Sequence, residues 1–340
     1  MDNGELAELH ASASVFEGHS DDFSDVAWRR AAGEHKVLQR RHLPELRAGG
    51  VDAMVANVVV EPVYRPYQAA PRALQMFGAA LDDLAECEET FRIVRTGGDF
   101  ARAAAANQIA LVVGLEGGDP VEFSTESLRV FWEIGVRSLI LAWNYRNLLA
   151  EGAFDFGSGG GLSVMGERIV HEADRLGIVI DVSHLPPAAV RHVLRVTKRP
   201  VIASHTNAAA LFEHPRNLPD AELRAIGASG GVIGVVCVRA LLASGDATID
   251  HVVAQIEYLL NLVGDRHVGI GTDFNAFMRT GEAGTVGEVF THGFRPTKGF
   301  SEWRHFPDLT RRLVERGHSA DTVKGVLGDN FTRFFTRALG

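Results

Sequence analysis

The sequence has little cysteine and no long apolar segment. Only Cys87 and Cys237 occur among its 340 residues, and they form no CxxC pair. At most one disulfide is possible, which is typical of a reducing compartment and leaves any metal site to histidine and carboxylate side chains. No run of about 18 apolar residues is present that could span a bilayer. The first dozen residues also lack the basic start and apolar centre of a signal peptide, so we expect a cytoplasmic protein with no membrane partner.

Positive charge is also scarce. The 34 lysines and arginines are outnumbered by 43 acids, which gives a formal net charge of −9. Because binding to phosphates requires a basic surface, this composition argues against a nucleic-acid partner. Neither cysteine lies in a motif typical of a cysteine nucleophile. The chemistry of the protein must therefore be looked for among its histidines and acids.

Eight short apolar segments predict the strands of a barrel. Each is β-branched or apolar almost throughout, as in strands that are buried on both faces of a parallel sheet. The segments are residues 13–16, 51–60, 110–115, 136–142, 178–181, 200–204, 231–238 and 268–272. Helical stretches such as residues 164–176 lie between them, and no linker divides the chain. We therefore predict a single domain over residues 1–340, a (β/α)₈ TIM barrel whose reactive groups lie at the carboxyl ends of the strands.

Side chains that can bind metals follow four of these segments. In chain order they are His19, Asp21, Glu116, His184 and His205, and a lone acid, Asp273, follows the last segment. His19 and Asp21 are two residues apart, so on an extended chain their side chains leave the same face. Glu116 precedes two glycines, which allow the backbone to turn sharply. This order predicts a two-metal site over the mouth of the barrel.

Taken alone, each candidate has a plainer explanation. Most of the 14 histidines lie among polar neighbours. Those expected to be solvated include His35, His42, His192, His251 and His318. His184 and His205 differ because each closes a buried strand, where an unpaired imidazole would be costly. Glu116 by itself could be a salt-bridge partner. The ordered combination favours the metal site.

Several motifs resemble those of one family. Residues 17–21 (EGHSD) are similar to its DGHND motif, and residues 181–184 (DVSH) and 214–217 (HPRN) are identical to family motifs. Further matches are residues 46–50 (LRAGG), 114–118 (GLEGG), 161–166 (GLSVMG) and 269–274 (GIGTDF). From about residue 13 to 338 the chain resembles the membrane dipeptidases, peptidase family M19, which are barrel hydrolases of the amidohydrolase type.

The resemblance implies a centre with two zinc ions. By it, His19 and Asp21 hold one Zn²⁺ and His184 and His205 hold the other. Glu116 bridges the two ions together with a hydroxide, which attacks the amide carbonyl. The implied activity is that of a zinc metallo-dipeptidase, which hydrolyses dipeptides or related small amides with a free C-terminal carboxylate. Family members commonly form homodimers.

The resemblance also assigns roles around the metals. Asp273 matches the acid that takes a proton from the hydroxide and delivers it to the leaving amine. Arg216 matches the residue that binds the C-terminal carboxylate of the substrate, for which a bidentate guanidinium is suited. Trp143 stands where many members have a histidine that contacts the substrate carbonyl, and we assign it to the substrate pocket together with Asn144.

Other departures leave an alternative open. Val59 and Val238 replace two tyrosines of the mammalian enzymes, which would weaken polar recognition of an ordinary dipeptide. The chain could therefore be a catalytically inactive, dipeptidase-like protein that only binds metal. Retention of Asp273 favours the enzyme, because a protein that only binds zinc needs no proton shuttle. The natural substrate, its stereochemistry and the metal used in the cell are left open by the sequence.

Overall fold

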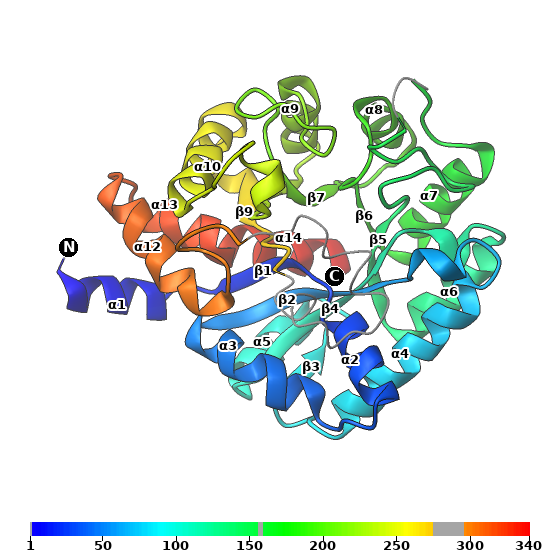
Figure 1. Ribbon diagram of the computed structural model, residues 1–340, viewed down its shortest axis with the longest axis horizontal. Helices are drawn as coiled ribbons and strands as arrows, with labels where there is room; N and C mark the ends of the chain where they lie inside the picture. The colour runs from blue at the N-terminus through cyan, green and yellow to red at the C-terminus, as the bar shows by residue number, and fades with distance from the viewer. Residues whose placement is uncertain (1, 156–158, 275–295) are drawn as a thin grey trace.

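The computed structural model describes residues 2–155, 159–274 and 296–340, and these are built around one parallel sheet. The strands are β1 (Val15–Ser20), β2 (Val51–Val59), β3 (Phe91–Ile93), β4 (Ile109–Glu116), β5 (Val136–Ile140), β6 (Val179–Asp181), β7 (Ile202–Thr206), β8 (Val232–Val235) and β9 (Val268–Ile270). Eight of them follow the order β1-β2-β4-β5-β6-β7-β8-β9, and β3 pairs with β4 outside this path. Because β1 and β9 also contact each other, the sheet curves into a nearly closed barrel (Figure 1). The predicted (β/α)₈ fold is confirmed.

Helices alternate with the strands and surround the barrel (Figure 1). The described α-helices are α1 (Asn3–Ala11), α2 (Asp22–Ala31), α3 (Leu43–Ala48), α4 (Ala69–Ala85), α5 (Gly98–Ala105), α6 (Thr125–Ile134), α7 (Val164–Leu176), α8 (Pro187–Val196), α9 (Asp220–Ala228), α10 (Ile249–Val263), α12 (Phe306–Glu315), α13 (Ala320–Lys324) and α14 (Asn330–Leu339). Helix α7 shows why these segments are helical. Ser163 caps its first turn, a left-handed glycine ends it, and its buried residues recur at helical spacing.

Two strands differ from the prediction. The predicted segment 13–16 belongs to a strand that continues to Ser20, and all six of its residues are buried. His19 therefore lies within a strand, whereas His184 follows one. The short strand β3 was missed because its central Arg92 interrupts the apolar pattern and three residues give no periodicity.

Phenylalanines close the amino-terminal end of the barrel. The rings of Phe331 and Phe335, on α14, lie 5.4 Å and 5.5 Å from the ring of Phe16 on β1, measured between centroids. The same buried cluster contains residues near the starts of other strands, namely Ala53, Ala110, Val179, Ile202 and Val232. A Cβ at Gly269 would lie only 2.6 Å from the Phe331 ring, so glycine is required at that position of β9. This packing leaves the carboxyl end of the barrel for a functional site.

A buried acid joins the first strand to the last. Glu17 accepts hydrogen bonds from the backbone N–H of Thr272 at 2.7 Å, from the Thr272 hydroxyl at 2.5 Å and from the indole N–H of Trp303 at 3.0 Å. Burial raises the pKa of Glu17 to about 7 although these hydrogen bonds act in the opposite direction. Glu17 thus fixes the position of β1 relative to the segment that follows β9.

One expectation about the histidines is wrong. His42 is 4 % exposed rather than solvated, and its Nε2 lies 2.8 Å from Oδ2 of Asp25. Its Nδ1 lies 3.5 Å from Oδ1 of Asp22, so two carboxylates of α2 compensate the burial of this imidazole. Cys87 and Cys237 are both buried and free. Within the described ranges, no helix combines the length and the apolar character needed to cross a membrane.

Candidate active site

The five predicted metal ligands converge at the carboxyl end of the barrel. Nε2 of His19 lies 3.3 Å from Oε2 of Glu116 and 3.7 Å from Oδ1 of Asp21. The other oxygen of Glu116, Oε1, lies 2.8 Å from Nε2 of His184, and this nitrogen lies 2.8 Å from Nε2 of His205. All five residues are buried. Glu116 therefore lies between the pair His19 and Asp21 and the pair His184 and His205, with one oxygen toward each.

The backbone is unusual at three positions of this cluster. Gly117 has a φ of 98°, which turns the chain immediately after Glu116, as the two glycines predicted. His184 and Asp273 have φ values of 69° and 54°, a left-handed conformation that non-glycine residues rarely adopt. Such backbone strain persists where the surrounding structure holds it, commonly at functional sites.

Three polar atoms in the cluster have no hydrogen-bond partner among the described residues. They are Nε2 of His19, Oδ1 of Asp21 and Oε2 of Glu116. Leaving buried polar atoms unpaired is costly, and a cation between them would compensate all three. Three groups of possible ligands overlap here, each with donor atoms within 4.8 Å of one another: Glu116 with His184 and His205, His19 with Asp21 and Asp273, and His19 with Asp181 and His205. The donor set of imidazoles and carboxylates fits divalent ions such as zinc.

The protonation states of His184, His205 and Glu116 also fit metal binding, whereas the charge of Glu116 raises the pKa of His19 against the effect of burial, and burial raises the pKa of Asp21. Burial lowers the pKa of His184 to about 3, and the positive charge of Arg216 acts in the same direction. Burial and the charge of His19 lower the pKa of His205 as well. Burial alone would raise the pKa of Glu116, but the positive charge of His19 and the closeness of His184 hold it well below its usual range. Neutral imidazoles and an ionised carboxylate are the forms that bind a metal.

Asp273 lies beside the pair His19 and Asp21. Its backbone N–H donates to the carbonyl of His19 at 3.4 Å. Burial raises the pKa of Asp273 to about 6; the charge of Glu116 also raises it, while that of His19 opposes the rise. A carboxyl group that titrates near neutral pH is suited to accept and return a proton.

Three supporting side chains were not among the predicted site residues. Oγ of Ser204 lies 2.8 Å from Nδ1 of His205, and Nδ2 of Asn57 lies 3.2 Å from Nδ1 of His19. A carboxylate oxygen of Asp181 lies within 4.8 Å of ring nitrogens of both histidines. Asp181 ends an apolar segment, so the criterion that found the ligands would have found it too. The roles of Ser204 and Asn57 depend on contacts between strands, for which the sequence carries no signal.

The predicted substrate residues Trp143 and Asn144 lie next to the histidines. Oδ1 of Asn144 lies 2.9 Å from Nδ1 of His184, so this side chain contacts a predicted metal ligand. The ring of Trp143 is 6.0 Å from the ring of His184 and inclined to it by 27°. Val59 is buried at the end of β2, and Val238 is partly exposed after β8.

Arg216 is a buried guanidinium close to this cluster. It is 5 % exposed and forms no ion pair with any residue of the described ranges. Burial lowers its pKa to about 10, against the opposing charges of Asp273, Glu116 and Asp181. A buried guanidinium without a partner is suited to receive a carboxylate.

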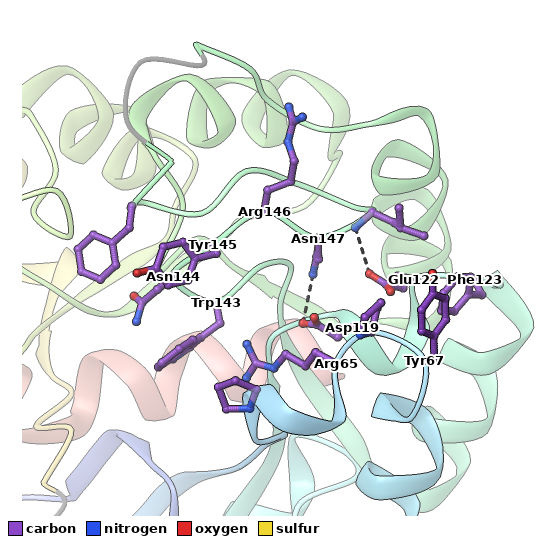
Figure 2. A pocket seen from close by; sticks show the side chains of 14 residues that line it. Arg65, Tyr67, Asp119, Glu122, Phe123, Trp143, Asn144, Tyr145, Arg146 and Asn147 are labelled. Atoms are coloured by element: carbon purple, nitrogen blue, oxygen red, sulfur yellow. Dashed lines mark hydrogen bonds between the residues drawn. The ribbon is translucent and has the colours of Figure 1, made fainter. Parts of the chain in front are cut away.

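A cavity of about 810 Å³ is lined by residues that include Trp143 and Asn144, the two neighbours of His184 (Figure 2). Its lining comes from the loops that follow β2, β4 and β5. In Figure 2 the side chain of Arg65 reaches toward Trp143, while Asp119 and Glu122 lie on the other side of Arg65. Several large apolar side chains at this cavity are exposed, among them Tyr67, Phe123, Tyr145 and Leu148.

Fold and site together define a metal-dependent hydrolase built on a parallel barrel. Residues 4–339 match the membrane dipeptidase family, peptidase family M19. The chain belongs to this family, as the motifs predicted, and it is a metallopeptidase of the dipeptidase type.

Individual relatives agree with this assignment. The chain is 31 % identical over 355 residues to the dipeptidase aclJ of Aspergillus oryzae, and the match covers 96 % of the chain and 79 % of aclJ. It is 28 % identical over 348 residues to the dipeptidase verJ of Clonostachys rogersoniana, covering 96 % and 84 % of the two proteins. The crystal structure of an amidohydrolase from Pseudomonas aeruginosa superposes with a TM-score of 0.81 at 29 % identity, over 98 % and 99 % of the two chains.

Proposed function

We propose that this protein is a zinc dipeptidase with two metal ions, which hydrolyses dipeptides or related small amides with a free C-terminal carboxylate. The observation that carries the proposal is the position of Glu116. Its two oxygens face two separate histidines, 3.3 Å from His19 and 2.8 Å from His184, in a buried site where unpaired polar atoms would otherwise be costly.

Each residue of the cluster has a distinct duty in this proposal. His19 and Asp21 hold one Zn²⁺, His184 and His205 hold the other, and Glu116 bridges both. When bound, the two ions lower the pKa of water and polarise the scissile carbonyl. Side chains of the protein carry out the remaining steps, which are proton transfer and positioning of the substrate.

Asp273 moves the proton. Its pKa of about 6 allows it to accept a proton from the attacking water and to return it to the nitrogen of the leaving amino acid. Arg216 binds the carboxylate of that leaving amino acid, which fixes the amide in position for attack. Trp143 covers the neighbouring side of the site, and together with Asn144 borders the cavity that receives the acyl part of the substrate.

A catalytically inactive metal-binding protein is less well supported. The duty proposed for Asp273 is needed only for turnover. We further expect a cytoplasmic location and a homodimer, as the sequence and the family resemblance suggest.

The direct test is hydrolysis by zinc-reconstituted protein of a panel of L,L- and L,D-dipeptides and N-acyl amino acids, followed by release of the free amine. A matched preparation treated with chelator and the variant Glu116→Gln serve as controls. We expect activity on at least one class that is lost in both controls. Protein that contains two zinc ions and hydrolyses nothing in the panel would support the inactive alternative instead.

A further inference from the structure

Arg65 lies across the barrel from Arg216. It belongs to the loop after β2, whereas Arg216 lies in the loop after β7. In the strand order β1-β2-β4-β5-β6-β7-β8-β9, β2 and β7 are four places apart. Half-way round an eight-membered barrel is the opposite side, so the two loops lie on opposite sides of the barrel mouth, and the charge of Glu116 acts on both guanidinium groups.

Contacts on one edge hold the Arg65 side chain in place and leave its other edge free. Its Nε donates to the carbonyl of Val60 at 2.8 Å, and its Nη2 donates to the same oxygen. Its Cζ lies 5.0 Å from the centre of the Trp143 ring, which is within the range of a cation–π contact. In the part of the chain that the structure describes, Arg65 forms no ion pair. Arg65 lines the cavity, and the contacts with Val60 use only one edge of its guanidinium, so the N–H groups of the other edge can donate to a ligand there.

Each of the two neighbouring acids uses one oxygen in a contact elsewhere, and Oε1 of Glu122 has no hydrogen-bond partner among the described residues. Oε2 of Glu122 accepts the backbone N–H of Leu148 at 3.0 Å, and Oδ2 of Asp119 accepts from Asn147 at 3.3 Å. Both carboxylates thus hold the loop after β5 and neither forms an ion pair with Arg65. Burial lowers the pKa of Arg65, although the charges of Asp119 and other acids oppose this. Because Arg65 is largely buried and forms no ion pair among the described residues, a direct hydrogen-bonded contact with an anion would stabilise its charge.

We propose that Arg65 is a specificity-determining residue that binds an anionic group on the acyl side of the substrate, so that preferred substrates carry two carboxylates. This inference rests on the proposed function, since Arg216 takes the carboxylate of the leaving amino acid and Arg65 takes the second one. The Trp143 ring and the Val60 carbonyl orient the guanidinium before the substrate arrives. A fork fixed in this way forms two parallel hydrogen bonds to a carboxylate at little cost in side-chain entropy.

The test compares L-Glu-Ala with L-Gln-Ala, which have the same shape and differ in one charge. Each peptide is made with both L- and D-alanine, so that an unknown stereochemical preference does not decide the outcome, and L-Lys-Ala is included. We expect kcat/KM of the zinc-loaded enzyme to be about 10- to 100-fold higher for the Glu peptide, the range for a hydrogen bond between charged groups. In Arg65→Met this ratio falls to about one, while kcat/KM for the Gln peptide changes less than about 3-fold.

Arg146→Met is the matched control, because Arg146 lines the same cavity but its side chain is 65 % exposed and pairs with Glu151. It should keep the preference for the Glu peptide. Wild-type enzyme that treats Glu and Gln peptides alike, or that prefers the Lys peptide, overturns the inference but not the proposed function. An equal loss for both peptides in Arg65→Met also overturns it, because Arg65 would then only support Trp143. Zinc-loaded protein that hydrolyses none of these peptides overturns both.

Discussion

Nδ1 of His184 lies 2.9 Å from the side-chain oxygen of Asn144. An amide oxygen can only accept, so this contact places a proton on Nδ1 and leaves the lone pair of Nε2 directed toward Glu116 and His205. A histidine that binds a metal through Nε2 needs this tautomer. Asn144 therefore orients a proposed metal ligand in addition to bordering the cavity.

Removing this acceptor should weaken metal binding. Asn144→Leu, which cannot accept a hydrogen bond, should raise the dissociation constant for zinc about 10- to 100-fold, as is typical for partners of metal-binding histidines. Competition with a chromophoric chelator measures the change. Asn144→Asp keeps the acceptor and should retain wild-type affinity. Equal affinities in the Leu variant and the wild type would show that Asn144 contacts only the substrate.

The bridging position of Glu116 predicts that one substitution affects both metals. Glu116→Gln should reduce the zinc content from about two ions per chain to less than one, because a neutral amide cannot replace a carboxylate shared by two cations. Metal analysis of protein prepared without chelator provides the measurement. Glu122→Gln, a change to another buried acid outside the cluster, should keep both ions. A Glu116→Gln protein that retains two ions would contradict the bridge.

Asp273 should matter for turnover and not for metal content. Asp273→Asn removes the proton acceptor but keeps the shape, so kcat should fall about 10²- to 10⁴-fold with KM little changed. Zinc stoichiometry and kcat are measured on the same preparation. Near-normal kcat would rule out the proton shuttle, and loss of a zinc ion would show that Asp273 is a ligand.

Trp143 should select against small substrates. Its indole fills more volume than an imidazole and carries no charge, so the native site should favour an apolar group near the scissile bond. Trp143→His should raise kcat/KM for Ala-Ala relative to Phe-Ala. Tyr145→His, at the exposed rim of the same cavity, is the control and should leave this ratio unchanged. An unchanged ratio in Trp143→His would show that the indole does not set specificity.

His42 should make stability depend on pH. Burial lowers its pKa, but the charge of Asp22 and the contact with Asp25 outweigh burial and raise the pKa above 6.5. A raised pKa in the folded state means that the contribution is full below the pKa of the unfolded chain and is lost as the pH rises through the folded value. His42→Gln should therefore lose about 1 to 3 kcal/mol of unfolding free energy at pH 6 and clearly less at pH 9.

Urea denaturation of wild type and variant at both pH values gives this difference. His35→Gln is the control, because the His35 side chain is 66 % exposed and its contact with Glu86 is screened by solvent. A loss for His42→Gln that is the same at both pH values would mean that the buried imidazole is neutral throughout.

The barrel and the convergence of the five candidate ligands could be predicted from sequence for a physical reason. Parallel strands buried on both faces give apolar segments, and their carboxyl ends meet at one end of the barrel, so Glu116 and His205 could be assigned from position alone. Glu116 and His205 lie within strands rather than just after them. This was not predicted from the sequence, because a polar residue at the end of a strand does not mark the last residue of the strand sharply.

Contacts between side chains of distant segments could not be predicted. The burial of His42 depends on carboxylates supplied by α2, and the hydrogen bond between Asn144 and His184 depends on how two loops face each other. No pattern in the sequence indicates that the guanidinium of Arg65 lies over the ring of Trp143. Local patterns fix which face of an element is buried, whereas such contacts are decided by tertiary packing.

The hydrogen bond from Thr272 to Glu17 joins residues that are 255 positions apart in the chain. During synthesis, His19 and Asp21 leave the ribosome long before Asp273 and the phenylalanines of α14 exist. Contacts of such long range form late in folding. Until then the apolar face of β1, which carries Phe16, is exposed and can promote aggregation. The nascent chain therefore contains all five predicted metal ligands once His205 has been added, but it lacks until Thr272 the contact that holds the strand of His19 in place. Only the nearly finished chain can fix the geometry of the site.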